Sequence, residues 1–198
     1  MTEQRTPRGT DRRAVVVEVA RRVLVDDGFE AFGMRRIAEL SGMRLGNLQY
    51  YFATRDDLLE AVLRAEGARD LAALRAAPDD PENPDDPERH LTGALGVLLH
   101  EWGSSGGSVY APLTLLAVHD ERFATVCREI YAAFYAELAV VVRRVDPTAT
   151  AAQARSRAIL ITALVDGAAV QQTVIGAGAR RRLLADLGRL AIGLARGD

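Results

Sequence analysis

Three side chains that can hydrogen-bond to the edges of bases stand close together in the chain: Arg44, Asn47 and Gln49. An Arg side chain pairs bidentately with guanine, and Asn or Gln pairs bidentately with adenine. Leu45 stands between them and offers an apolar contact to a thymine methyl group. We therefore expect these four side chains to face the major groove of double-stranded DNA.

Tyr51 and Arg55 follow directly and suit a different contact, the phosphate backbone of DNA. Hydroxyl and guanidinium groups bind phosphate oxygens, and the first turn of a helix directs backbone N–H groups and its dipole at an anion. Thr54 is a good N-cap for such a helix, and Asp57 comes close to completing a capping box. For each of these exposed residues, a solvated side chain without a ligand is the alternative.

Two short helices must hold the predicted contact residues in place. The hydrophobic spacing predicts an amphipathic helix over residues 11–27, a short helix over 34–40 and another over 44–50. Gly42 lies between the short helices, where a tight turn favours a residue without a Cβ atom. This order is typical of a helix-turn-helix unit, whose second short helix enters the major groove.

The rest of the chain also shows the helical period, and no alternating strand pattern of useful length occurs. The predicted fold class is therefore all-α, with about nine helices. An acidic, Pro-rich connector over residues 78–88 interrupts the pattern, because its four Pro residues exclude a helix and its six carboxylates repel one another.

An ordered series of residues runs through the predicted helix-turn-helix unit. It consists of Gly28-Phe29, Ile37-Ala38, Ser41-Gly42-Met43, Gly46-Asn47-Leu48, Tyr51-Phe52, Thr54-Arg55 and Leu58-Leu59. In this combination, residues 11–65 resemble the DNA-binding end of the TetR family of bacterial transcriptional regulators. Arg44, Gly33 and Gln49 depart from the residues usual in that family, which leaves the operator sequence open.

The resemblance implies an amino-terminal three-helix DNA-binding domain over residues 1–55 and a connecting helix over 56–77. The acidic loop over 78–88 and a helical ligand-binding and dimerisation domain over 89–198 follow. It also implies that the protein is a repressor that binds a (pseudo)palindromic operator as a homodimer. A small-molecule effector would release this repressor from the DNA. A basic arm adds DNA contacts or forms a disordered tail. The arm consists of Arg5, Arg8, Arg12 and Arg13.

Stripes of apolar and small residues near the carboxyl terminus resemble the dimer interface of the family, although an intramolecular core uses the same pattern. The expected interface residues are Ile159, Ala163, Asp166, Val170, Leu187 and Leu190. Effector pockets are mostly apolar with a few polar groups. The expected lining residues are His100, Trp102, Tyr110, His119, Tyr131, Phe134, Tyr135 and Gln171, with plain core packing as the alternative.

Asp166 stands in an otherwise apolar helix, where burial without a partner is costly. Three interpretations remain open at this point: it binds a cationic ligand, it pairs with an Arg across a dimer, or it is solvated.

Patterns typical of enzymes do not occur in the sequence. It contains no Gly-x-Ser-x-Gly, no metal-ligand spacing among its three His residues and no phosphate-binding Gly loop. We therefore expect neither catalysis nor a metal or cofactor. Cys127 is either a redox sensor or a small buried apolar residue. The alternative to a regulator is a helical module that binds a small molecule or a partner without recognising DNA.

The composition indicates a soluble chain of one or two domains, with 198 residues, 48% hydrophobic residues and a net charge of -2. All 25 basic residues are Arg. One Cys cannot form an internal disulfide, which favours a reducing compartment. No stretch has the pattern of a signal peptide or the length of a membrane span, so we expect a cytoplasmic protein without membrane contact.

Overall fold

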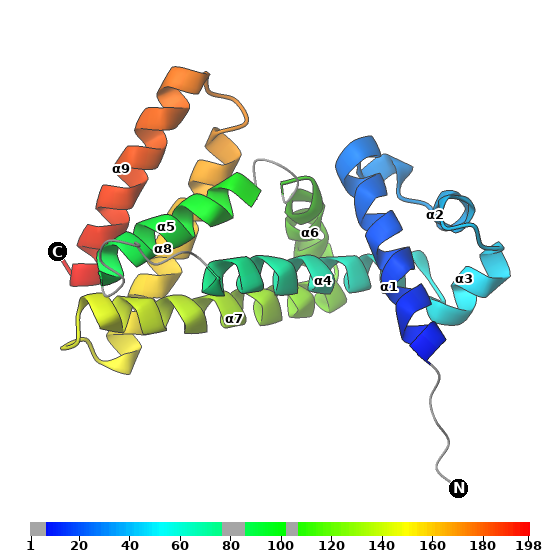
Figure 1. Cartoon of the computed structure of the whole chain (residues 1–198), viewed down its shortest axis with the longest axis horizontal. Coiled ribbons are helices and arrows are strands. Elements are labelled where there is room, and N and C mark those ends of the chain that lie inside the picture. The colour runs from blue at the N-terminus through cyan, green and yellow to red at the C-terminus, as the bar shows by residue number, and fades with distance from the viewer. Residues whose placement is uncertain (1–6, 77–85, 102–106) are drawn as a thin grey trace, which may run out of the picture. The chain divides into compact units, whose positions relative to one another are not determined.

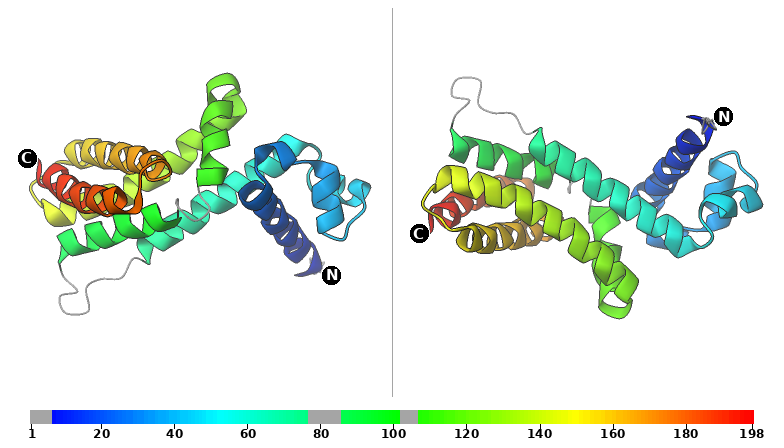
Figure 2. Two further views of the ribbon diagram at one scale, coloured as in Figure 1. Left: turned by 90° about the horizontal axis from the view of Figure 1, so that it is seen from above. Right: turned by 90° about the horizontal axis from the view of Figure 1, so that it is seen from below.

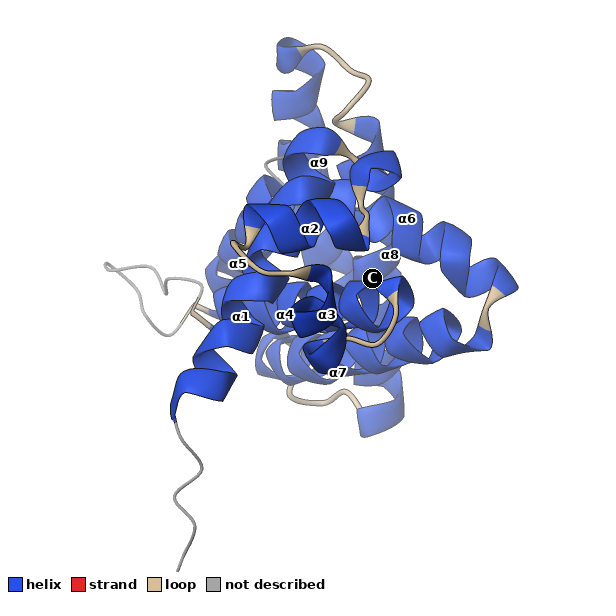
Figure 3. Cartoon of the chain, turned by 90° about the vertical axis from the view of Figure 1, so that its right-hand side faces the viewer, coloured by secondary structure: helices blue, strands red, loops and turns tan. Residues whose placement is uncertain are grey.

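The computed structural model describes residues 7–76, 86–101 and 107–198. Every regular element within these ranges is helical (Figure 3), which confirms the all-α prediction. The α-helices are α1 Pro7–Arg22, α2 Met34–Leu40, α3 Leu45–Tyr51, α4 Arg55–Arg75, α5 Pro87–Glu101, α6 Gly107–His119, α7 Glu121–Val145, α8 Ala151–Gln171 and α9 Ala177–Arg196. A π-helical turn, η1 (Val23–Asp27), and a 3-10 turn, η2 (Phe29–Ala31), join α1 to α2.

The chain forms two compact units. The first unit comprises Met1–Glu66 and Ser108–Val126, and the second comprises Gly67–Gly107 and Cys127–Asp198. Within the described ranges, α6 from Ser108 onward and residues 121–126 of α7 group with the amino-terminal helices. The domain boundary expected at residue 55, with 89–198 in one domain, stays a prediction.

The first unit has a core to which each of its amino-terminal helices contributes. Val16 of α1, Ile37 of α2 and Leu48 of α3 are fully buried, as is Leu58 near the start of α4. In Figure 1, α2 and α3 lie next to one another in the part of the chain drawn in light blue and cyan, and α1 packs against α2. Apolar residues at helical spacing therefore form the buried faces of α1, α2 and α3.

In the second unit, α5, α8 and α9 pack against one another around a core rich in Ala and Leu (Figure 2). Ala158 and Ala191 are fully buried, and such small side chains allow helices to approach closely. Thr150 begins α8 with a reciprocal capping box to Gln153. Gly197 ends α9 in the left-handed conformation, with φ at 87°.

Candidate DNA-reading surface

Helix α3 presents polar side chains on either side of its core residue. Leu48 is fully buried, whereas Asn47 and Gln49 are exposed on the same helix. Arg44 is also exposed and occupies the N-cap position of α3. These three residues are the ones expected from the sequence to read base edges, so the structure brings them together on one accessible helix.

The remaining predicted contact residues of this region are less accessible. Leu45 and Tyr51 are half-buried. Tyr50 is 86% exposed. Because Tyr50 lies on the outer face of α3, it joins the candidate DNA-contact residues.

The turn between α2 and α3 fixes the direction of α3. Gly42 has φ at 63°, a left-handed conformation that glycine adopts without strain. The backbone N–H of Met43 donates to the carbonyl of Ala38 at 2.8 Å, and the Ser41 hydroxyl donates to the carbonyl of Ile37 at 2.6 Å. The predicted helix-turn-helix unit is thus present, with its second short helix held on the core by Leu48.

The start of α4 follows α3 closely and carries a full capping box. The N–H of Asp57 donates to the Thr54 hydroxyl at 3.1 Å, and the N–H of Thr54 donates to the Asp57 carboxylate at 2.9 Å. Asp at this position therefore completes a motif usually formed by Glu or Gln. The capped turn fixes the chain immediately after the recognition helix.

Arg55, the expected phosphate contact, also has partners within the chain. Its Nε donates to the carbonyl oxygen of Phe32 at 2.8 Å, and its guanidinium carbon lies 4.5 Å from the ring centre of Phe29 and 5.4 Å from that of Phe32. These contacts tie the start of α4 to η2, which precedes α2. Spacing gave no signal of this pairing, because its partners lie more than 20 residues away.

A hollow of about 440 Å³ opens beside the end of α3, within the first unit. Its walls include Gln49, Tyr50, Tyr51 and Arg13, whose guanidinium carbon lies 4.7 Å from the centre of the Phe52 ring. Arg13 is thereby the member of the expected basic arm that the structure places next to α3. The arm residue Arg5 lies outside the described residues.

Comparison with known proteins agrees with this geometry. Residues 16–62 match the family model of bacterial regulatory proteins of the tetR family, and residues 108–192 match the carboxy-terminal model of BetI-type transcriptional repressors. The chain belongs to the TetR family of bacterial transcriptional regulators. The prediction made from the ordered motif is confirmed.

Individual relatives add detail on this TetR-family chain. It is 38% identical over 53 residues to the HTH-type transcriptional regulator PksA of Bacillus subtilis, a match that covers 27% of the chain and 26% of PksA. A TetR transcription regulator from Haloarcula marismortui has the same fold, with a TM-score of 0.75, 21% identity and coverage of 95% of this chain and 98% of that one. The multidrug binding protein EbrR, complexed with proflavin, is 28% identical with a TM-score of 0.62, over 90% of this chain and 99% of EbrR.

The expected effector residues of this TetR-family chain do not gather at one described pocket. Tyr110 and His119 belong to the first unit, and the remaining described ones belong to the second. Tyr110 is buried, Tyr131, Phe134 and Tyr135 are half-buried, and His100, His119 and Gln171 are exposed. Trp102 lies outside the described residues.

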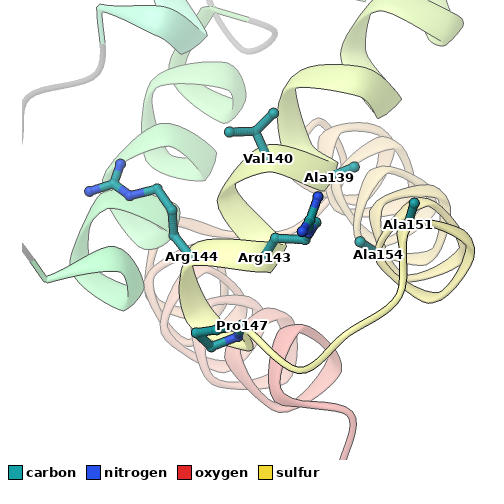
Figure 4. A pocket seen from close by; sticks show the side chains of 7 residues that line it. All are labelled: Ala139, Val140, Arg143, Arg144, Pro147, Ala151 and Ala154. Atoms are coloured by element: carbon teal, nitrogen blue, oxygen red, sulfur yellow. The ribbon is translucent and has the colours of Figure 1, made fainter.

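A pocket of about 440 Å³ lies where α7 ends and α8 begins, and none of the expected effector residues lines it. Figure 4 shows Arg143 and Ala139 on the side of α7 that faces the start of α8, with Arg144 directed away from it.

Asp166 contacts aromatic side chains inside the second unit. The Tyr131 hydroxyl donates to the Asp166 carboxylate at 2.8 Å, and Tyr135 packs against Tyr131 with ring centres 5.8 Å apart. Burial raises the pKa of Asp166 above its usual range, and the hydrogen bond from Tyr131 opposes this shift. Burial also raises the pKa of the neighbouring Cys127 thiol, which disfavours the reactive thiolate of a redox sensor.

Apart from the half-buried Asp166, the expected dimer residues separate into two groups. Ile159, Ala163, Val170 and Leu190 are exposed, with exposed fractions of 58% for both Val170 and Leu190. Leu187 is only 4% exposed and packs in the core of its own chain. The intramolecular alternative therefore applies to Leu187, because the period of α9 turns it toward α5 and α8 rather than outward.

Among the described residues, no group of three or more His, Cys, Asp and Glu side chains could hold a metal ion. In the same ranges, no helix combines the length and apolarity needed to cross a bilayer.

Proposed function

We propose that this TetR-family protein is a cytoplasmic repressor that binds a (pseudo)palindromic operator as a homodimer and is released by a small-molecule effector. The observation that carries the proposal is the accessibility of α3, where Arg44, Asn47 and Gln49 are exposed while Leu48 anchors the helix. One such helix reads only a few base pairs, so two copies about one DNA turn apart, roughly 34 Å, supply specificity.

Cell-free transcription tests the repressor role directly. The template carries the DNA that flanks the gene for this protein, and the purified protein is added in steps. A repressor lowers the transcript from this template and leaves an unrelated promoter unaffected. A rise in transcript would identify an activator, and an unchanged transcript would favour the helical module that does not recognise DNA.

A second copy of the chain is the partner that fits the apolar surface of α8 and α9. Ile159, Val170 and Leu190 expose apolar side chains there, and Ala163 leaves room for a close approach of helices. Isologous pairing of such a surface buries it on both copies at once, and it places two reading helices in the symmetric arrangement that a palindrome requires.

The substitution Val170→Glu is expected to weaken the dimer at least about 100-fold, because each copy would bury a carboxylate in an apolar interface. Sedimentation at micromolar concentration measures the change. Val140→Glu on α7 is the matched control, since Val140 is 61% exposed and lies on another helix. Equal dimer stability in both variants would contradict the proposed interface.

The effector is proposed to be a cation with an apolar body. Asp166 supplies a half-buried carboxylate, and Tyr131 and Tyr135 supply ring faces beside it, which is the chemistry that holds organic cations. The structure of EbrR with proflavin, a planar aromatic cation, supports this class of ligand.

The substitution Asp166→Asn is expected to weaken binding of two test cations, choline and proflavin, about tenfold. It removes the negative charge at this position and keeps an oxygen that accepts from the Tyr131 hydroxyl. Titration calorimetry measures this, with Asp186→Asn on α9 as the control and the uncharged carbon isostere of choline as a comparison ligand. Equal binding by both variants, or equal binding of the isostere, would exclude Asp166 as the cation site.

Asp166→Asn should also change how the stability of the protein depends on pH. Because the pKa of Asp166 is raised in the folded chain, folding takes up protons, and wild-type stability falls as pH rises through that pKa. The Asn side chain does not ionise, so the stability of Asp166→Asn does not fall in this way as pH rises. Its stability relative to the wild type should therefore be higher at about pH 7 than at about pH 4, as measured by urea unfolding.

A further inference from the structure

Arg122, in the first turn of α7, donates to two carboxylates on α4. Its Nη2 lies 2.6 Å from Asp57 Oδ1 and its Nε lies 2.7 Å from Glu60 Oε2. All three residues belong to the first unit. We call this arrangement the Arg122 bridge, and no part of the family resemblance indicated it.

The bridge acts on the turn that follows the recognition helix. Asp57 uses its other oxygen, Oδ2, to accept from the N–H of Thr54 in the capping box that begins α4. One carboxylate therefore joins the cap of α4 to α7. Because α3 ends at Tyr51, only a few residues separate this cap from the reading helix.

The two donors used in the bridge point toward carboxylates rather than toward an incoming phosphate. The hydrogen bond from Arg122 lowers the pKa of Asp57, and hydrogen bonds from Arg64 and then Arg122 lower the pKa of Glu60. Both acids are thus held ionised beside the guanidinium. A network in which one cation serves two carboxylates orders its side chains better than an isolated surface pair.

We propose that Arg122 is a positioning residue for DNA binding, which holds the capped start of α4 and thereby the recognition helix in the geometry that reads DNA. The proposal rests on the proposed function. α7 continues past Arg122 into the second unit, where Tyr131 of the same helix contacts Asp166. The bridge therefore makes the start of an effector-domain helix part of the DNA-binding unit.

The test compares Arg122→Gln with Arg143→Gln, an equal change of charge at an exposed residue of the same helix. Binding of each full-length variant to the flanking DNA is measured at several salt concentrations. Arg122→Gln is expected to bind the DNA about fivefold more weakly than the control. The slope of the logarithm of the binding constant against the logarithm of the salt concentration should be unchanged. A slope reduced by about one would mean that Arg122 contacts a phosphate directly, which would overturn the proposal.

The substitution Glu60→Gln distinguishes the Arg122 bridge from a simple effect of charge, because the two predict opposite changes in DNA binding. Removal of a negative charge from a DNA-binding unit strengthens binding if charge alone matters. The bridge predicts weaker binding instead, about two- to threefold, together with faster amide hydrogen exchange at residues 54–60 in both Glu60→Gln and Arg122→Gln. Tighter binding by Glu60→Gln, or unchanged exchange in both variants, would overturn the proposal.

The two proposals fail in different ways. If the wild type itself shows no specific DNA binding, the proposed function fails. If the wild type binds specifically and Arg122→Gln matches Arg143→Gln in both affinity and exchange, only the role of Arg122 fails.

Discussion

Replacing Arg44, Asn47 and Gln49 together by Ala is expected to abolish specific DNA binding, with a loss of at least about 100-fold. Each bidentate contact to a base contributes about 1–3 kcal/mol of discrimination, and the three side chains are exposed on α3 and at its N-cap. Ala has the highest helix propensity, so α3 should stay folded in the variant. Fluorescence anisotropy with labelled flanking DNA and an unrelated competitor measures the loss.

Arg143→Ala is the control for this experiment, because it removes the same net charge from an exposed residue of the second unit. Its binding should match the wild type. Circular dichroism should show the same helix content for the wild type and both variants. If the triple variant binds the flanking DNA within twofold of the wild type, α3 is not the reading helix.

The second large effect concerns a buried ion pair in the first unit. Glu66 is 1% exposed and accepts from Arg21 Nε at 2.6 Å and from Arg21 Nη2 at 3.2 Å. Arg21→Leu removes these two charge-assisted hydrogen bonds from a carboxylate that is almost fully buried. We expect a loss of about 3 kcal/mol in the free energy of unfolding, measured by urea denaturation.

Two further variants separate the ion pair from general effects on α1. Arg22→Leu changes a neighbour that is 66% exposed, and it should cost less than about 0.5 kcal/mol. Combining Arg21→Leu with Glu66→Leu should recover part of the loss, because a buried apolar pair replaces a buried charge. A single Arg21 variant as stable as the Arg22 variant would show that the pair contributes nothing.

The sequence alone predicted most of the local structure. The hydrophobic spacing predicted the short helix that the structure shows as α3, and Gly42 identified the turn that its positive φ requires. Thr54 marked the cap of α4, although the full box with Asp57 emerged only from the structure. Such features depend on neighbours within one or two helical turns, which spacing reports directly.

Pairings between distant residues were not predicted. Arg55 was expected at a phosphate, and the structure places it against Phe29 and Phe32. The contacts from Arg21 to Glu66 and from Arg122 to Asp57 join residues 45 and 65 positions apart. A helical period identifies which face of a helix is polar, but it does not identify which charge of another helix meets it.

Titration of the purified protein against the DNA that flanks its own gene, at two salt concentrations and with an unrelated duplex as competitor, tests the central claim most directly. The proposed function predicts saturable binding that survives the competitor and weakens as salt rises. Binding that the competitor abolishes, or no binding even at low salt, would contradict the assignment of α3 as a specific reader of that DNA.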